Sequence, residues 1–168
     1  MIFVRGDTLT LGSNDKEFKA SERPAMKVIL DYDFYLGIHE FTCGEFQELT
    51  KIEDLKDFSS CENDSLPLAD VTYYDAILIA NAKSKSEKRD TAYTYRSKVF
   101  NSENHCINLE GIAFNPEANA YRLPTEAEWV LTASQSWDPK NSAGMPIILI
   151  SNLIQFVLQG SIPPVFVI

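Results

Sequence analysis

The chain has 168 residues, of which 45% are hydrophobic and 23% are charged, the composition of one globular domain with a core of its own. Its formal net charge of −9 argues against nucleic acid and against an anionic membrane surface as partners. Met1–Arg5 is too short for the apolar part of a signal peptide. The protein is therefore expected to be cytoplasmic, or extracytoplasmic if a leader has been removed.

Short strands are predicted in the first part of the chain. Ile2–Val4 and Thr8–Leu11 are β-rich and flank Gly6-Asp7, which is a turn pair. A polar loop over residues 14–25 follows. Two further extended segments are then expected, Met26–Leu30 and Phe34–Ile38.

Two helices begin with the same pattern, a threonine followed three residues later by an acid. In this capping box the threonine hydroxyl and the acid each bond to the other's backbone N–H. Thr42 with Glu45 begins a helix of about two turns. Thr72 with Asp75 begins a longer helix that ends in the basic stretch 83–88, which suits a helix C-terminus.

A third capping box, Thr125 with Glu128, begins the last predicted helix. Pro124 stands just before it, where it blocks upstream helix and can pack on Trp129 as a hydrophobic staple. We expect Trp129 to lie in the core.

Between the second and third helices, Tyr93–Phe100 and Ile107–Phe114 are predicted to form a hairpin around Asn101–Asn104. Small strands and short helices thus alternate without βαβ regularity, and this predicts an α+β domain with much irregular structure.

The three cysteines, Cys43, Cys61 and Cys106, are widely spaced, and the two histidines, His39 and His105, are far apart. Ligand count makes a zinc site improbable. One disulfide with one remaining thiol, or three reduced thiols, are both compatible with the sequence. No spacing typical of a catalytic triad or nucleophile elbow is present.

Residues 141–168 contain no charged residue. Pro146, Asn152 and Gln155 interrupt the apolar run before it reaches the roughly 20 residues of a membrane helix. We therefore separate a domain over residues 1–140 from an apolar tail over 141–168. The tail could be a buried or aggregation-prone strand pair, a segment that docks on a partner, or a frameshifted or truncated end; the abrupt loss of charge favours the last interpretation.

The segment Arg122–Trp129 reads R-L-P-T-E-A-E-W and resembles the signature of the formylglycine-generating enzyme or sulfatase-modifying-factor family. Weaker similarities stand in family order. Met1–Ser13 resembles the family's F-V-x-G start, Glu22-Arg23-Pro24 its E-x-P step, and Pro67–Ala76 its P-V…V-S/T-W-x-D-A segment. Together they cover roughly residues 1–137.

The resemblance implies an irregular α+β fold related to C-type lectins, here possibly incomplete. Enzymatic members convert a sulfatase cysteine to formylglycine with oxygen and a copper ion held by two cysteines, while other members are iron-dependent or non-catalytic. The family's later motifs, which include its catalytic cysteines and a calcium-binding segment, are missing from this sequence. No cofactor is therefore expected, copper or calcium being implied only if the missing half is supplied.

The resemblance assigns no catalytic, cofactor-binding or metal-binding residue of the family to a position in this sequence. The residues singled out are structural: Glu40, Thr42, Thr72, Asp75, Arg122, Pro124, Thr125, Glu128 and Trp129. His39-Glu40-Phe41-Thr42 is similar to the family's E-V-T step. Arg122 and Glu40 thus both occupy motif positions of the resemblance, and we expect a bidentate salt bridge between them.

The favoured function is a domain without oxidase catalysis that acts as a binding or structural module, or as a truncated member, with an unknown protein or glycan as partner. One alternative is a formylglycine-generating oxidase that acts on a sulfatase cysteine through unusual copper ligands. The other, a fold-level analogy, is a lectin-like module that binds carbohydrate or peptide.

Overall fold

The computed structural model describes residues 1–51, 55, 61–136 and 157–159, so most of the tail and the residues that precede it, 137–140, lie outside the described part. In chain order its elements are β1 (Ile2–Val4), β2 (Thr8–Leu11), the 3-10 turn η1 (Ala20–Glu22), β3 (Met26–Ile29), β4 (Phe34–Leu36), α1 (Cys43–Thr50), α2 (Tyr73–Ser86), β5 (Tyr93–Thr94), β6 (Ser97–Phe100), β7 (Cys106–Glu110), β8 (Ala113–Phe114), β9 (Ala120–Arg122), α3 (Glu126–Ser136) and β10 (Val157–Gln159). The mixture of helices and small sheets confirms the α+β class.

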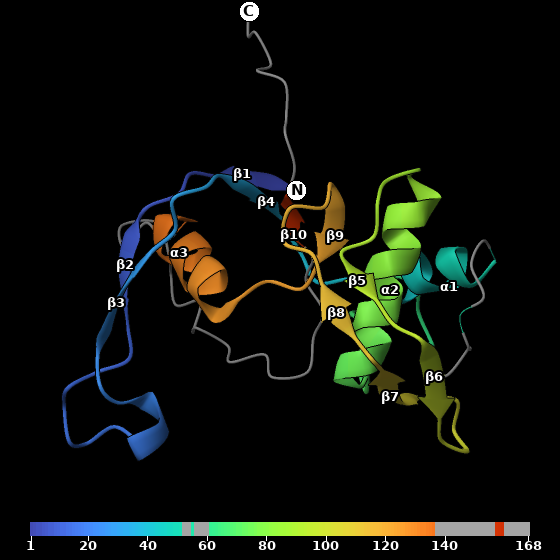
Figure 1. Cartoon of the computed structure of the whole chain (residues 1–168), viewed down its shortest axis with the longest axis horizontal. Helices are drawn as coiled ribbons and strands as arrows, with labels where there is room; N and C mark the ends of the chain where they lie inside the picture. The colour runs from blue at the N-terminus through green and yellow to red at the C-terminus, as the bar shows by residue number, and fades with distance from the viewer. Residues whose placement is uncertain (52–54, 56–60, 137–156, 160–168) are drawn as a thin grey trace, which may run out of the picture.

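A four-stranded sheet with the order β1-β4-β10-β9 lies at the centre of the fold (Figure 1). Each neighbouring pair runs antiparallel. The register places Phe3 opposite Tyr35, and Leu158 opposite both Tyr35 and Tyr121. Strands from the beginning, middle and end of the chain therefore meet in one sheet.

The predicted strands at the start of the chain are present, but β1 and β2 do not pair with each other. β1 pairs with β4, and β2 pairs with β3 in a separate two-stranded sheet. At Gly6 an added Cβ would lie 2.4 Å from the carbonyl oxygen of Leu30. The predicted turn pair is thus a close crossing of two backbones, through which the chain leaves one sheet for the next.

The predicted hairpin between the second and third helices is present, with each arm divided into two strands. β6 pairs with β7, and β5 pairs with β8. The register shifts near Phe100, where Val99 faces Asn108 and Phe100 faces Cys106, so Ile107 is an additional residue of the kind found in a β-bulge.

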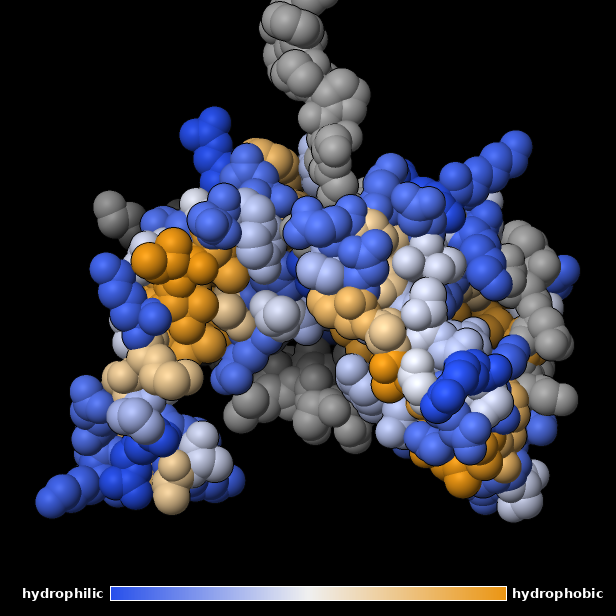
Figure 2. Space-filling model, viewed as in Figure 1, coloured by the Kyte–Doolittle hydropathy of each residue, from blue (hydrophilic) through white to orange (hydrophobic). Residues whose placement is uncertain are grey.

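The side chains pack in two apolar clusters. The larger one surrounds α2, whose central turns are buried on nearly every side, and includes residues of α1, β7 and β9. The smaller one joins β1 and β4 to Ala127 and Leu131 of α3. Figure 2 shows further apolar surface over α3 with β2 and β3, and again around β6 and β7. None of the described helices is long and apolar enough to cross a bilayer.

Candidate functional site

The first turn of α3 is fixed by a buried ion pair. Arg122 Nη1 donates to Glu128 Oε2 at 2.8 Å, and Arg122 Nη2 donates to Oε1 at 2.5 Å. The Tyr32 hydroxyl also donates to Glu128 Oε1, at 3.0 Å. Because Glu128 has no exposed surface and Arg122 is 4% exposed, the two charges neutralise each other away from water.

The predicted capping box is part of the same cluster. The Thr125 N–H donates to Glu128 Oε2 at 2.7 Å, and the Glu128 N–H donates to Thr125 Oγ1 at 3.2 Å. Burial acts to raise the pKa of Glu128, but hydrogen bonds from Arg122 and Thr125 outweigh it and lower that pKa. Burial alone would lower the pKa of Arg122, yet the bonds to Glu128 raise it. Both groups are therefore held in their charged forms.

Two expectations about this region are wrong. Arg122 makes its bidentate salt bridge with Glu128 and not with Glu40, because the short connection from β9 to α3 brings Glu128 onto the guanidinium. Trp129 is half-buried, and within the described part of the chain it belongs to neither apolar cluster. The inward positions of the first turns belong to Ala127 and Leu131, and Trp129 is rotated away from them around the helix axis. Pro124 is also half-buried.

A second buried carboxylate, Asp75, lies at the start of α2. It accepts the Thr72 N–H at 3.1 Å and the Cys106 N–H at 2.7 Å, and its Oδ2 lies 2.8 Å from Nδ1 of His105. The Thr72 hydroxyl donates to the Cys106 carbonyl at 2.6 Å. The predicted capping box is thus present and also joins α2 to β7.

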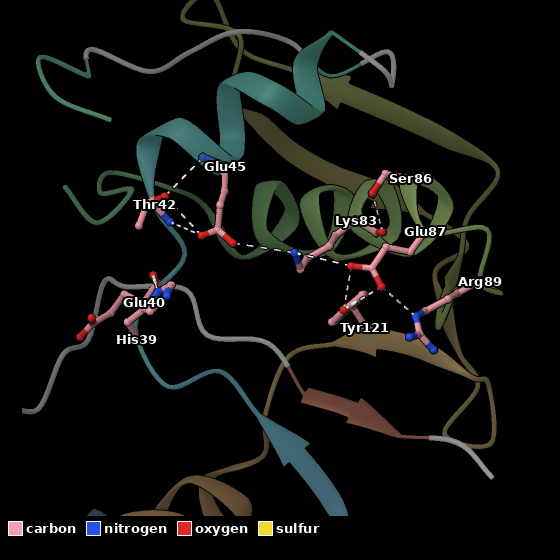
Figure 3. Close-up of polar contacts among 9 residues, drawn as sticks. All are labelled: His39, Glu40, Thr42, Glu45, Lys83, Ser86, Glu87, Arg89 and Tyr121. Atoms are coloured by element: carbon pink, nitrogen blue, oxygen red, sulfur yellow. Dashed lines mark hydrogen bonds and ion pairs between the residues drawn. The ribbon is translucent and has the colours of Figure 1, made fainter. Parts of the chain in front are cut away.

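The third cluster connects α1, α2 and β9 through a lysine (Figure 3). Lys83 Nζ lies 3.8 Å from Glu45 Oε1 and 3.9 Å from Glu87 Oε1. It also lies 5.0 Å from the centre of the Tyr121 ring and 6.0 Å from that of Phe41, within reach of cation–π attraction.

Glu87 continues this cluster toward β9. The Tyr121 hydroxyl donates to both oxygens of Glu87, at 2.8 and 2.9 Å, and Arg89 Nε donates to Oε2 at 3.0 Å. Burial and the bond to Glu87 raise the pKa of Tyr121 to about 12, so its hydroxyl remains a donor at physiological pH.

Sequence reasoning missed this lysine cluster. The sequence predicts a helix C-terminus at the basic stretch 83–88, where solvated side chains are the ordinary expectation, whereas the Lys83 side chain is only 23% exposed. The available signal was the i,i+4 spacing of Lys83 and Glu87. Thr42 caps α1 with Glu45 as predicted, its N–H donating to Glu45 Oε2 at 2.9 Å. Glu40, in contrast, lies apart from the cluster beside His39 (Figure 3).

The three cysteines now have assigned states. Cys43 and Cys61 form a disulfide, which ties the start of α1 to a residue eighteen positions later. Cys106 is buried and not disulfide-bonded, and burial raises the pKa of its thiol. Within the described residues, no three His, Cys, Asp or Glu side chains are grouped so that they could hold a metal ion.

The sequence matches the family described as the sulfatase-modifying factor enzyme 1-like domain over residues 1–143. The chain belongs to this family. Over 112 residues it is 32% identical to the chaperone protein LppX of Paenibacillus barcinonensis, and the match covers 65% of the chain and 39% of LppX. The crystal structure of CarF is similar with a TM-score of 0.53 and 23% identity, over 79% of this chain and 55% of that one.

The chain therefore spans about two fifths of the curated relative and just over half of the solved structure that it matches. The copper ion that the resemblance implies for oxidase members needs two thiolates that converge on one point. Here two of the three cysteines are bonded to each other and the third is buried. As folded, these cysteines do not fit a two-thiolate copper site.

Proposed function

We propose that this chain is a sulfatase-modifying-factor-like module that binds a partner protein without formylglycine-generating chemistry. The observation that carries the proposal is the Cys43–Cys61 disulfide. It leaves Cys106 as the one cysteine outside a disulfide, and a buried thiol of raised pKa is a poor ligand and a poor nucleophile.

Further support comes from LppX, the relative named as a chaperone protein. A chaperone acts by contact with another polypeptide, so its role is compatible with a domain that has a scaffold and no oxidase centre. The proposal includes a C-type-lectin-like arrangement for the fold, in which irregular segments are held on small sheets. The charge clusters at Arg122, Asp75 and Lys83 then serve to fix the scaffold.

The first experiment tests the oxidase alternative. The purified chain is incubated with a sulfatase-motif peptide, copper and oxygen, and the mass of the peptide is measured. We expect no change, both for the oxidised protein and after mild reduction, which would place the Cys43 and Cys61 thiols side by side. A mass loss on the peptide cysteine that disappears in the Cys61→Ser variant would overturn the proposal and assign the oxidase activity to this pair.

The second experiment tests protein binding directly. Aggregation of a chemically unfolded client protein is followed by light scattering with and without the chain. We expect suppression at near-stoichiometric amounts of the chain, and none with an unrelated acidic protein of the same size. Unchanged scattering together with a specific signal on a glycan array would contradict binding to a protein and favour a carbohydrate as the ligand.

A further inference from the structure

One of the two inner strands of the main sheet, β10, comes from outside the family-matched region. The family match ends at residue 143, and β10 comprises Val157–Gln159. β10 follows α3 after the twenty residues 137–156, yet it lies between β4 and β9 and pairs with both. The sheet of the family domain is therefore divided by a slot that a strand from elsewhere fills (Figure 1).

One wall of this slot, β4, is held in place without help from β10. β4 pairs along its other edge with β1. Its residues Phe34 and Leu36 are 1% and 3% exposed and belong to the smaller apolar cluster. Its backbone edge toward the slot is thus positioned by the rest of the domain.

The opposite wall, β9, is held from the side of the helices. The Tyr121 N–H donates to the buried Ser84 hydroxyl of α2 at 2.8 Å. The Tyr121 side chain is fixed by Glu87 and Arg122 by Glu128. Two preorganised strand edges that face one gap form a site for an extended peptide, in which main-chain hydrogen bonds provide the affinity.

We infer that the slot between β4 and β9 is a binding site for an extended, uncharged apolar segment of a partner protein, and that β10 is its intramolecular occupant. This inference rests on the proposed protein-binding function. The occupant that is present identifies the ligand chemistry: β10 belongs to a stretch with no charged residue, and it runs antiparallel to both walls.

The connection of residues 137–156 determines how the partner competes. Because β10 belongs to the same chain as the slot, it competes intramolecularly, and segments linked in this way act at an effective concentration on the order of millimolar. A partner segment therefore binds weakly while β10 occupies the slot and tightly once β10 has left it. The chain's own strand acts as a competitor that a partner must displace.

The test uses the full-length chain with Leu158→Pro, which removes a backbone N–H and places a proline in a strand paired on both sides. The matched control is Val165→Pro, in the same uncharged tail but beyond β10. The probe is a dye-labelled peptide with the sequence of residues 154–161 and a solubilising tag, and its binding is measured by fluorescence anisotropy. A second probe carries proline at the position of Leu158.

We expect Leu158→Pro to bind the first peptide at least tenfold more tightly than the wild type and Val165→Pro, and to ignore the proline-containing peptide. Amide hydrogen exchange of segments 34–36 and 120–122 should be faster in Leu158→Pro and slow down again when the peptide is added. If the variant folds only in the presence of the peptide, the inference is also supported.

Equal affinities for all three proteins would overturn the inference, as would a Leu158→Pro variant that stays unfolded with the peptide present. The client-aggregation assay separates the two proposals. If the wild type suppresses aggregation but the variant does not bind the peptide, the slot is refuted as a peptide site and the protein-binding function stands. If the variant binds the peptide but the wild type does not suppress aggregation, the peptide site stands and the protein-binding function is refuted.

Discussion

Replacing Glu128 by glutamine tests whether the buried ion pair holds the start of α3. Glutamine keeps the size of the side chain and can still accept the Thr125 N–H, but it removes the carboxylate charge that faces Arg122, which is 4% exposed. Removing one partner of a buried pair costs about 3–5 kcal/mol. For a chain of this size that corresponds to a fall in Tm of roughly 6–20 °C.

The measurement is urea unfolding followed by tryptophan fluorescence, combined with a double-mutant cycle. Arg122→Met alone should cost a similar amount, because it leaves the Glu128 carboxylate buried without its cation. The double variant Arg122→Met/Glu128→Gln should lose less than the sum by more than about 1 kcal/mol, since neither charge then remains unpaired. Additive losses, or a Glu128→Gln variant within about 0.5 kcal/mol of wild type, would refute this account of the pair.

Four further outcomes are expected. Because the folded-state pKa of Glu128 is lowered, its contribution is present above the unfolded value of about 4.3 and is lost as pH falls through the folded pKa; acid titration of stability should therefore be flatter in Glu128→Gln than in wild type. Reducing the Cys43–Cys61 disulfide should lower the free energy of unfolding by about 3 kcal/mol, as expected for a loop of this length, and Cys61→Ser should show the same loss without further response to reductant. Trp129→Ala should lower the free energy of unfolding, measured by chemical denaturation, by about 2 kcal/mol, less than for a fully buried tryptophan, because the side chain is half-buried. A loss above about 4 kcal/mol would instead indicate that Trp129 is a core residue. Thr72→Ala should cost more than Thr42→Ala in the same assay, since the Thr72 hydroxyl also bonds to the carbonyl of Cys106; equal losses would contradict the role of that bond.

The helix starts could be predicted because the information is local. A threonine and an acid three residues apart bond to each other's backbone whatever the rest of the chain does, so the boxes at Thr42, Thr72 and Thr125 were readable from spacing alone. The family signature in Arg122–Trp129 is read from the same short segment.

Contacts between distant elements could not be read in this way. Motif positions predict Glu40 as the partner of Arg122, but charge complementarity fits Glu128 equally well, and the geometry of the β9–α3 connection selects Glu128. The lysine cluster draws Glu45, Lys83 and Tyr121 from three elements, and no spacing rule brings these positions together. The disulfide pairing depends in the same way on tertiary structure.

The tail illustrates a different limit. Its lack of charge favours a frameshifted or truncated end, and that interpretation stays a prediction. β10 nevertheless pairs in register with β4 and β9. A strand of three residues cannot be predicted from the pattern of an uncharged apolar segment. Its pairing depends on backbone N–H and C=O groups, which nearly every residue carries.

The position of β10 also has a consequence during protein synthesis. Its neighbours β4 and β9 emerge from the ribosome well before Gln159 does, and β1 leads them all. In the nascent chain the facing edges of β4 and β9 stay unpaired until β10 has been synthesised, and such sequence-distant pairings form slowly. Unpaired strand edges favour aggregation, so the rate at which the codons between α3 and β10 are translated should influence the yield of soluble protein.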